Sequence, residues 1–109
     1  MTDGRVKPLL FLGDSLQRIR DFPESARKAA GVEPHKVQQG IEPSDWKPMA
    51  SLGPGIREIR IWDEAGAFRV IYVANIEYAV YVVHAFQKKT ERTAKRDLDL
   101  VASRLKQIG

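Results

Sequence analysis

The residues best suited to do chemistry in this sequence are basic, and they lie within or just after its most apolar segments. Arg60 and Arg69 each lie inside a run rich in isoleucine, valine, phenylalanine or tyrosine. A third apolar run reaches His84 and is followed by Lys88 and Lys89. Arginine and lysine bind phosphate oxygens through charge and, for arginine, through paired hydrogen bonds. The pattern therefore indicates a site for a phosphate-bearing polyanion.

The net charge of +4 comes from 18 lysines and arginines against 14 acidic residues, and its distribution is uneven. Residues 84–109 contain seven basic and three acidic residues, whereas residues 1–83 contain 11 of each sign. The whole excess lies in the last quarter of the chain, where it could attract a polyanion. On charge alone, a basic tail that only improves solubility explains the pattern equally well.

The alternation of side chains along a strand indicates which of these residues share a face. In the segment 56–62, Glu58 and Arg60 fall on one face, and two isoleucines fall on the other, which is expected to face the core. The bulky neighbours of Arg69 place it on the same open face. Arg57 shares the face of the isoleucines, but it stands at the entrance of the strand, where it can reach solvent.

Taken singly, each of these residues has an ordinary interpretation, because exposed charges are common and a lone histidine is usually a hydrogen-bonded structural residue. Trp46 and Trp62 are interpreted as packing anchors in preference to base-stacking platforms. Lys95, Arg96 and Lys106 are expected on the solvated face of the last helix. A functional site is inferred only because arginines, lysines and a histidine from three strands and one loop can lie together on one face of the sheet.

Hydrophobic periodicity predicts the elements that must position this site. A short buried strand is followed by two helices, a long loop, three strands and a last helix. The second helix is expected to break near Gly31 to Pro34, since proline lacks an amide hydrogen and crowds the preceding turn. Turns at 63–66 and 75–77 make the three strands antiparallel neighbours. The predicted elements are a strand at 8–12, helices at 14–22 and 23–39, a loop at 41–55, strands at 56–62, 67–74 and 78–86, and a helix from residue 93.

This order predicts an α+β fold in which helices cover one face of a small antiparallel sheet and leave the other face available. At 109 residues, the chain is expected to form a single domain spanning 1–109. It has no cysteine and two widely separated histidines, so neither a disulfide nor a metal site is expected. No cofactor motif is present. The apolar stretches are too short for a membrane span or a secretory signal, so a cytoplasmic protein without membrane association is expected.

Several segments, taken in order, resemble one known protein family. They are EIRI at 58–61, AFRVIYV at 67–73, HAFQKKTERT at 84–93, SDWKPM at 44–49 and PLLFLGDSLQRIRDFP at 8–23. This ordered set resembles the HigB-like, phage-derived branch of the RelE/ParE toxin superfamily, from Pro8 to about Leu105. The resemblance implies a RelE-like fold, with an N-terminal helical hairpin, a small antiparallel sheet and a C-terminal helix.

The same resemblance implies the toxin of a type II toxin–antitoxin pair, acting as a metal-independent endoribonuclease that needs no cofactor. HigB-like and RelE-like members are mRNA interferases, which cut messenger RNA on the ribosome and so inhibit translation. The implied partners are mRNA, the ribosome and a cognate antitoxin that carries a helix-turn-helix DNA-binding domain. Two alternatives remain open: a ParE-like toxin that inhibits DNA gyrase, and a non-enzymatic, phage-derived RNA-binding regulator.

The resemblance also implies roles for individual residues. Arg60 and Arg69 match the basic positions on the two central strands, where they would bind phosphate and stabilise the transition state. His84 matches the histidine of the HxFxKK motif, and either His84 or Glu58 would serve as general base. The remaining residues implied in RNA binding are Lys47, Arg57, Lys88 and Lys89.

Overall fold

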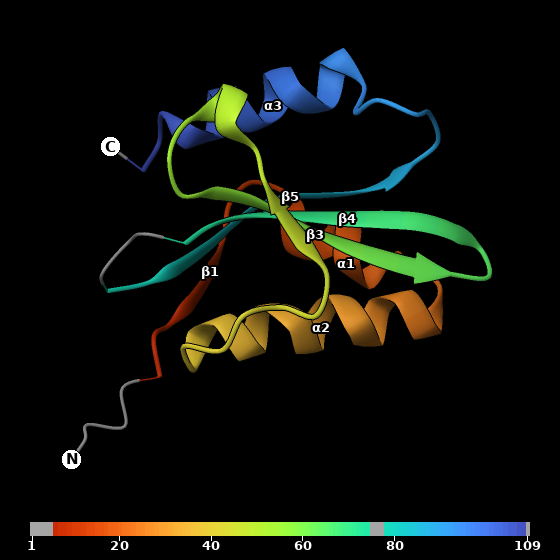
Figure 1. Cartoon of the computed structure of the whole chain (residues 1–109), viewed down its shortest axis with the longest axis horizontal. Coiled ribbons are helices and arrows are strands. Elements are labelled where there is room, and N and C mark those ends of the chain that lie inside the picture. The colour runs from red at the N-terminus through yellow and green to blue at the C-terminus, as the bar shows by residue number, and fades with distance from the viewer. Residues whose placement is uncertain (1–5, 75–77, 109) are drawn as a thin grey trace.

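A five-stranded sheet separates two layers of helix in the computed structural model (Figure 1). The structure describes residues 6–74 and 78–108, so the predicted turn at 75–77 lies outside the described residues. The mixed α+β architecture agrees with a RelE-like fold, and the predicted fold class is confirmed. The elements are β1 (Leu9–Phe11), α1 (Ser15–Arg20), α2 (Glu24–Gln38), β2 (Trp46–Pro48), η1 (Ala50–Leu52), β3 (Ile56–Asp63), β4 (Gly66–Val73), β5 (Val80–Lys88) and α3 (Lys95–Leu105).

The sheet has the strand order β1–β5–β4–β3–β2. Strands β3, β4 and β5 form the predicted antiparallel meander, and β2 pairs antiparallel with β3. Strand β1 differs, because it pairs in parallel with β5 at the far edge of the sheet. Valine, isoleucine, tyrosine and phenylalanine dominate the three long strands, as a buried pleated surface favours. The register brings residues of neighbouring strands into rows that cross the sheet.

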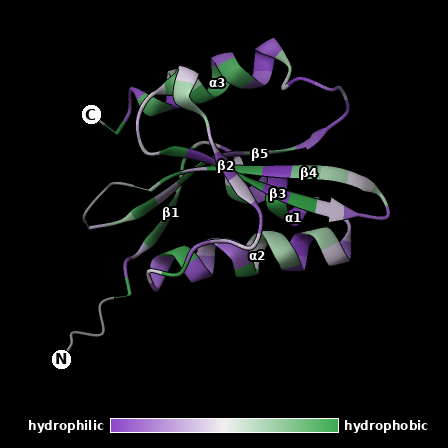
Figure 2. Cartoon of the chain, in the orientation of Figure 1, coloured by the Kyte–Doolittle hydropathy of each residue, from purple (hydrophilic) through white to green (hydrophobic). Residues whose placement is uncertain are grey.

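Helices α1 and α2 cover one face of the sheet and enclose the larger hydrophobic core. Ala26 and Ala30 of α2 are buried, and their small side chains let the helix lie close to the strands. Ile59 and Ile61 of β3 belong to this core, so the face predicted for the isoleucines is confirmed. Figure 2 shows hydrophobic and hydrophilic residues mixed along α2 and α3, as amphipathic helices require.

Helix α3 lies against the opposite face, so the expectation that this face is uncovered is wrong for the part near β5 (Figure 1). Val101 of α3 is buried in a second core with Ile71 and Phe86 of the sheet. The helix carries leucine or valine at 98, 101 and 105, a spacing that makes one apolar stripe in need of burial. The accessible part of this face lies toward β2 and β3, where Lys47 and Trp62 are exposed.

Helix α2 continues through Pro34, so the predicted break is wrong. An interior proline costs a helix about 3 kcal/mol, because one hydrogen bond is lost and the ring crowds the preceding turn. Pro34 is fully buried, and the hydrophobic contact of its ring offsets part of this cost. The helix ends after Gln38, and Gly40, the predicted stop, adopts a φ of 81° just beyond it.

The segment 41–55, expected to be an irregular loop, contains β2 and η1. Strand β2 lies at the edge of the sheet, a position where Pro48 is tolerated because an edge strand needs only one partner. The backbone N–H of Arg60 donates to the carbonyl of Asp45 at 2.8 Å, which extends the pairing of the segment with β3. This pairing brings Asp45 beside Arg60 and joins the segment to the candidate site.

Candidate functional site

Two arginines lie directly opposite each other on the central strands. Arg60 of β3 and Arg69 of β4 are register partners, and Lys47 of β2 is the register partner of Glu58. Residues opposite each other in a sheet point to the same side, so the shared face predicted for Glu58, Arg60 and Arg69 is confirmed. The arginine cluster is defined as Asp45, Lys47, Glu58, Arg60, Trp62 and Arg69.

The carboxylate of Asp45 holds the guanidinium of Arg60. Nε and Nη2 of Arg60 donate to Oδ1 of Asp45 at 3.0 and 2.8 Å, and the indole N–H of Trp62 donates to Oδ2 at 2.8 Å. The Trp62 hydrogen bond, followed by those from Arg60, lowers the pKa of Asp45, so this carboxylate is charged. Arg60 keeps 33% of its side chain exposed, so it is fixed and still reachable from solvent. Asp45 was missed as a site residue, although it lies in the SDWKPM segment.

Arg69 is buried beneath Trp62. Its guanidinium lies 4.9 Å from the centre of the Trp62 ring, and its Nη1 donates to the carbonyl of Phe68 at 3.0 Å. Burial lowers the pKa of Arg69, and the Glu58 carboxylate, 3.7 Å from its Nε, opposes that shift. The open position predicted for Arg69 is therefore wrong. Trp62 is 66% exposed, so it covers Arg69 at the surface instead of anchoring the core as predicted.

Glu58 is also buried, contrary to the open position predicted for it. Its Oε1 lies 3.7 Å from Nε of Arg69 and 3.9 Å from Nζ of Lys47. Within the described part of the chain, neither of its carboxylate oxygens accepts a hydrogen bond. A buried carboxylate of this kind is stable only beside cations. Glu58 is therefore the counter-charge of Arg69, whereas Lys47, 51% exposed, is the member of this group that reaches solvent.

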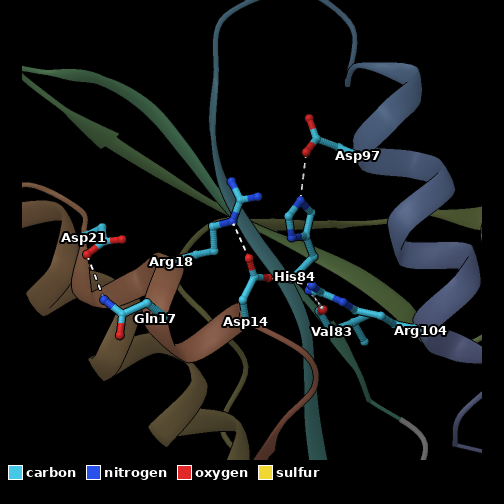
Figure 3. Close-up of polar contacts among 8 residues, drawn as sticks. All are labelled: Asp14, Gln17, Arg18, Asp21, Val83, His84, Asp97 and Arg104. Atoms are coloured by element: carbon cyan, nitrogen blue, oxygen red, sulfur yellow. Dashed lines mark hydrogen bonds and ion pairs between the residues drawn. The ribbon is translucent and has the colours of Figure 1, made fainter.

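His84 lies under α3, with its ring directed at Asp97 of that helix (Figure 3). Its Nε2 is 2.8 Å from Oδ1 of Asp97, its ring stacks on Phe86 with centroids 5.1 Å apart, and its side chain is fully buried. Burial lowers the pKa of His84; the hydrogen bond to Asp97 opposes this shift, and the charges of Arg104 and Arg18 add to it. The ring is therefore neutral near pH 7. The predicted place of His84 on an open sheet face is wrong, because α3 covers it.

Asp14, at the start of α1, binds Arg18 of the same helix and links α1 to α3 through Arg104 (Figure 3). Its Oδ1 accepts from Nη2 of Arg104 at 2.5 Å, and its Oδ2 accepts from Nε of Arg18 at 3.0 Å. Hydrogen bonds from these arginines lower the pKa of Asp14 to about 2. Nη1 of Arg104 also donates to the carbonyl of Val83 in β5 at 2.9 Å. Gly13 is required beside this network, since its φ is 53° and a Cβ there would lie 2.5 Å from the Arg104 guanidinium.

A pocket of about 390 Å³ lies where the end of β5 meets α1 and α3. Arg18 and Arg96 line it, and so does Lys89, one of the predicted RNA-binding residues. Lys88, half-buried at the end of β5, lines a smaller cavity of about 40 Å³ that shares most of its walls. Arg96 is exposed as predicted, yet it belongs to this pocket. The β5–α3 pocket is lined by Arg18, Phe86, Gln87, Lys89, Arg96, Asp97 and Leu100.

Arg57 lies on the opposite face of the sheet. Its register partner is Tyr72 of the larger core, and its guanidinium lies 4.0 Å from the centre of the half-buried Trp46 ring. Its Nη1 is 3.6 Å from Oε1 of Glu42. Arg57 and Tyr72 line a separate pocket of about 300 Å³. The structure therefore does not bring Arg57 together with the other predicted RNA-binding residues, because the alternation of β3 turns it away from them.

The arginine cluster and the β5–α3 pocket offer guanidinium and ammonium groups, whose shared chemistry is the binding of phosphate and other oxyanions. Among residues 6–74 and 78–108, no group of three or more histidine, aspartate or glutamate side chains is placed to hold a metal ion. In the same residues, no helix has both the length and the apolar character needed to cross a membrane.

Comparison with known proteins identifies the family. A search of curated proteins found no match to this chain. The family model described as Phage derived protein Gp49-like (DUF891) matches residues 17–106. The matched region contains every residue of the arginine cluster and of the β5–α3 pocket. This is a toxin-like family of the toxin–antitoxin type. The chain belongs to the phage-derived Gp49-like family (DUF891).

Proposed function

We propose that this protein is the toxin of a type II toxin–antitoxin pair and acts as an endoribonuclease on messenger RNA. One observation carries the proposal: Arg60, which is reachable from solvent, lies opposite the buried Arg69 on the neighbouring strand, and each guanidinium lies beside its own carboxylate. Two fixed guanidinium groups suit a phosphodiester, whose negative charge grows as it is cleaved. Membership of a toxin-like, phage-derived family supports the same class of function.

The proposed reaction is the attack of a ribose 2′-hydroxyl on the adjacent phosphate. The O2′–P bond forms and the P–O5′ bond breaks, which leaves a cyclic phosphate on one fragment and a 5′-hydroxyl on the other. The attacking oxygen loses a proton and the leaving oxygen gains one. Arg60 would contact the non-bridging phosphate oxygens, and Arg69 would add positive charge from beneath. Positioning and electrostatic stabilisation are thus the main contributions of the protein.

Glu58 and His84 are too deeply buried to touch the RNA, so we assign both to positioning. Glu58 orients Arg69, and His84 fixes Asp97 at the wall of the β5–α3 pocket. In the sheet, Ile71 lies between Glu58 and His84. Since neighbouring strands are about 4.8 Å apart, the two residues are separated by about 10 Å and serve different parts of the surface.

Trp62 and Lys47 complete the proposed contact with RNA. The indole of Trp62 is exposed above Arg69 and presents an aromatic surface on which a base can stack. Lys47 reaches solvent beside Glu58, where it can bind a backbone phosphate. Lys88 and Lys89 extend the basic surface at the end of β5. A single strand of RNA suits this combination of stacking and phosphate binding better than a duplex does, because its bases are available.

The proposed partners follow from the toxin class. The ribosome would present the mRNA, and a cognate antitoxin with a helix-turn-helix domain would neutralise the toxin. The resemblance to HigB-like toxins and the toxin-like character of the family support both. An antitoxin that shields the arginine cluster would need acidic groups, because the cluster members that reach solvent include the cations Arg60 and Lys47.

Induced expression in a bacterial host tests the proposal. Wild-type protein should arrest growth, and Arg60→Ala should relieve the arrest because the phosphate loses its accessible guanidinium. Lys28→Ala is a matched control, since Lys28 forms an exposed ion pair with Glu24 on α2, away from the arginine cluster. It should remain fully toxic. An Arg60→Ala protein that is folded by circular dichroism and arrests growth like the wild type would show that this site is wrong.

Purified wild-type protein also separates the two alternative functions. Inhibition of DNA supercoiling by gyrase, with RNA left intact, would indicate a ParE-like toxin. Binding of RNA without cleavage, together with normal growth of the expressing cells, would indicate a regulator. Either outcome would overturn the proposed endoribonuclease.

A further inference from the structure

We propose that the β5–α3 pocket is a second phosphate-binding site, which holds a backbone phosphate of the RNA strand bound at the arginine cluster. The inference rests on the proposed function for the identity of that strand. The bound group is an RNA phosphodiester. The residues that would bind it in the pocket are Arg18, Lys89 and Arg96.

Three cations converge on this pocket from different elements: Arg18 from α1, Lys89 from the segment after β5, and Arg96 from α3. Lys89 and Arg96 have no ion-pair partner among the described residues. Arg18 gives its Nε to Asp14, and its two Nη groups are not used in that hydrogen bond. Cations that share a concave surface raise its local potential, and an anion bound among them relieves their mutual repulsion.

Asp97 is the acidic residue that lines the pocket, and its carboxylate is engaged by His84, 2.8 Å away. The lining therefore carries three cations against one carboxylate and is net positive. A volume of about 390 Å³ falls in the range of pockets that bind small molecules, so a phosphate with part of its nucleotide can enter. The bonds of Asp14 to Arg18 and Arg104 hold α1 and α3 in place around it.

The register of the sheet connects the pocket to the arginine cluster. Phe86, in the pocket wall, is the register partner of Arg69, and Arg69 is the register partner of Arg60. One row across three neighbouring strands thus runs from Arg60 to the pocket, over about 10 Å. Arg69 and Phe86 are buried, so the RNA would pass over the next row, in which Trp62, Ala67 and Lys88 are register partners. A short extended strand of RNA on that path can contact both sites. Lys88, at the end of β5, lies beside this route.

Fluorescence anisotropy with a labelled single-stranded RNA oligonucleotide tests the proposal, with a gel to check that the RNA stays intact. Lys89→Ala/Arg96→Ala removes the two unpaired cations and should weaken binding about tenfold. The slope of log affinity against log salt should become shallower by about 0.7 for each lost phosphate contact. The matched control is Lys28→Ala/Lys95→Ala, which removes the same charge from two exposed residues paired with Glu24 and Asp99. Its affinity should equal that of the wild type.

Asp97→Asn gives a second test, in which RNA binding should become tighter instead of weaker. The amide oxygen can still accept a hydrogen bond from Nε2 of His84, so the packing of α3 is preserved. The pocket meanwhile loses its carboxylate, so RNA should bind about threefold more tightly. If Asp97→Asn binds RNA with the same affinity as the wild type, the pocket does not contact RNA.

The outcomes distinguish this inference from the proposed function. If Lys89→Ala/Arg96→Ala binds RNA as tightly as its matched control, the pocket is not a phosphate site, even where Arg60→Ala has lost toxicity. If wild-type protein does not bind the free oligonucleotide, this inference fails, whereas the proposed function fails only if wild-type protein also leaves mRNA intact in a translating extract. Weaker binding by the pocket variant, combined with full toxicity of Arg60→Ala, would support the pocket and overturn only the role of Arg60.

Discussion

At the scale of single residues, Trp62 joins the two central arginines. Its indole N–H binds Asp45, which fixes Arg60, and its ring lies over Arg69. Large aromatic side chains usually contribute through burial, yet this ring is 66% exposed. An exposed ring held in place by polar and cationic neighbours is suited to receive a base.

Trp62→Ala should weaken the binding of single-stranded RNA by about tenfold, because base stacking on an aromatic side chain is worth about 1–3 kcal/mol. Trp62→Phe is the matched variant: it keeps a ring over Arg69, loses the hydrogen bond to Asp45, and should retain most of the affinity. Anisotropy titrations measure both. Thermal denaturation should leave Trp62→Ala close to the wild type, since little of the ring is buried. Equal RNA affinity of Trp62→Ala and the wild type would contradict base stacking.

The sequence predicts the direction of these side chains better than their exposure. Alternation along β3 and β4 is enough to place Glu58, Arg60 and Arg69 on one face, because the period of a strand is fixed. Their burial depends on β2 beside Glu58 and on the Trp62 ring over Arg69, contacts that exist only once the strands have paired. Asp45 was missed for the same reason, since its contact with Arg60 exists only once 45–48 pairs with β3.

At the scale of elements, side chains from two helices donate hydrogen bonds to backbone carbonyls of β5 where the strand lacks a full strand partner. Strand β1 pairs with β5 only at Val80 to Val82. Beyond it, the hydroxyl of Ser15 donates to the carbonyl of Val82 at 3.2 Å, and Arg104 donates to the carbonyl of Val83 at 2.9 Å. Helices α1 and α3 thereby replace a strand partner and protect this edge. The β5–α3 pocket lies farther along the same edge.

The Asp14 network predicts a stability that depends on pH. Its folded pKa of about 2 lies below the ordinary value of 3.8, so its contribution is complete above about pH 4 and is lost as the pH falls toward about 2. Asp14→Asn should therefore be less stable than the wild type at about pH 7. The difference should be roughly 1 kcal/mol or less, since 48% of the Asp14 side chain is exposed and solvent screens the pairs.

Urea denaturation of both proteins at about pH 7 and about pH 2 measures this effect. The two midpoints should differ near neutrality and converge in acid, because protonated Asp14 no longer pairs with Arg18 and Arg104. A difference that persists unchanged at the lower pH would show that the ionised carboxylate is not what stabilises the junction of α1 and α3.

The order of the elements was predictable because each long element carries an apolar stripe of its own period. Two local features misled the prediction. Pro34 is a helix breaker in isolation, but its burial within a long amphipathic helix favours continuation. The prolines and glycines of 41–55 are typical of a loop, yet the segment pairs with the edge of β3, and that pairing depends on the rest of the sheet.

At the scale of the whole molecule, the basic excess of the last quarter divides into separate roles. Arg104 is buried in the junction with α1, and Lys95 pairs with Asp99 on the helix surface. Lys89 and Arg96 face the β5–α3 pocket. A charge count could not separate a solubilising tail from a polyanion site, because only the fold decides which cations are paired and which converge. Of the cations in the last quarter, the proposed RNA path uses the unpaired Lys89 and Arg96, where the path from Lys47 reaches the pocket.

The most direct test of the central claim is the cleavage of RNA itself. A translating extract programmed with one mRNA is supplied with wild-type protein, Arg60→Ala or the control Lys28→Ala, and primer extension maps new ends. The wild type and Lys28→Ala should cut the transcript at the same positions, and Arg60→Ala should cut it about 100-fold more slowly, since a fixed donor to the developing charge is lost. A transcript left intact by folded wild-type protein, or cut equally by wild type and Arg60→Ala, would contradict the claim.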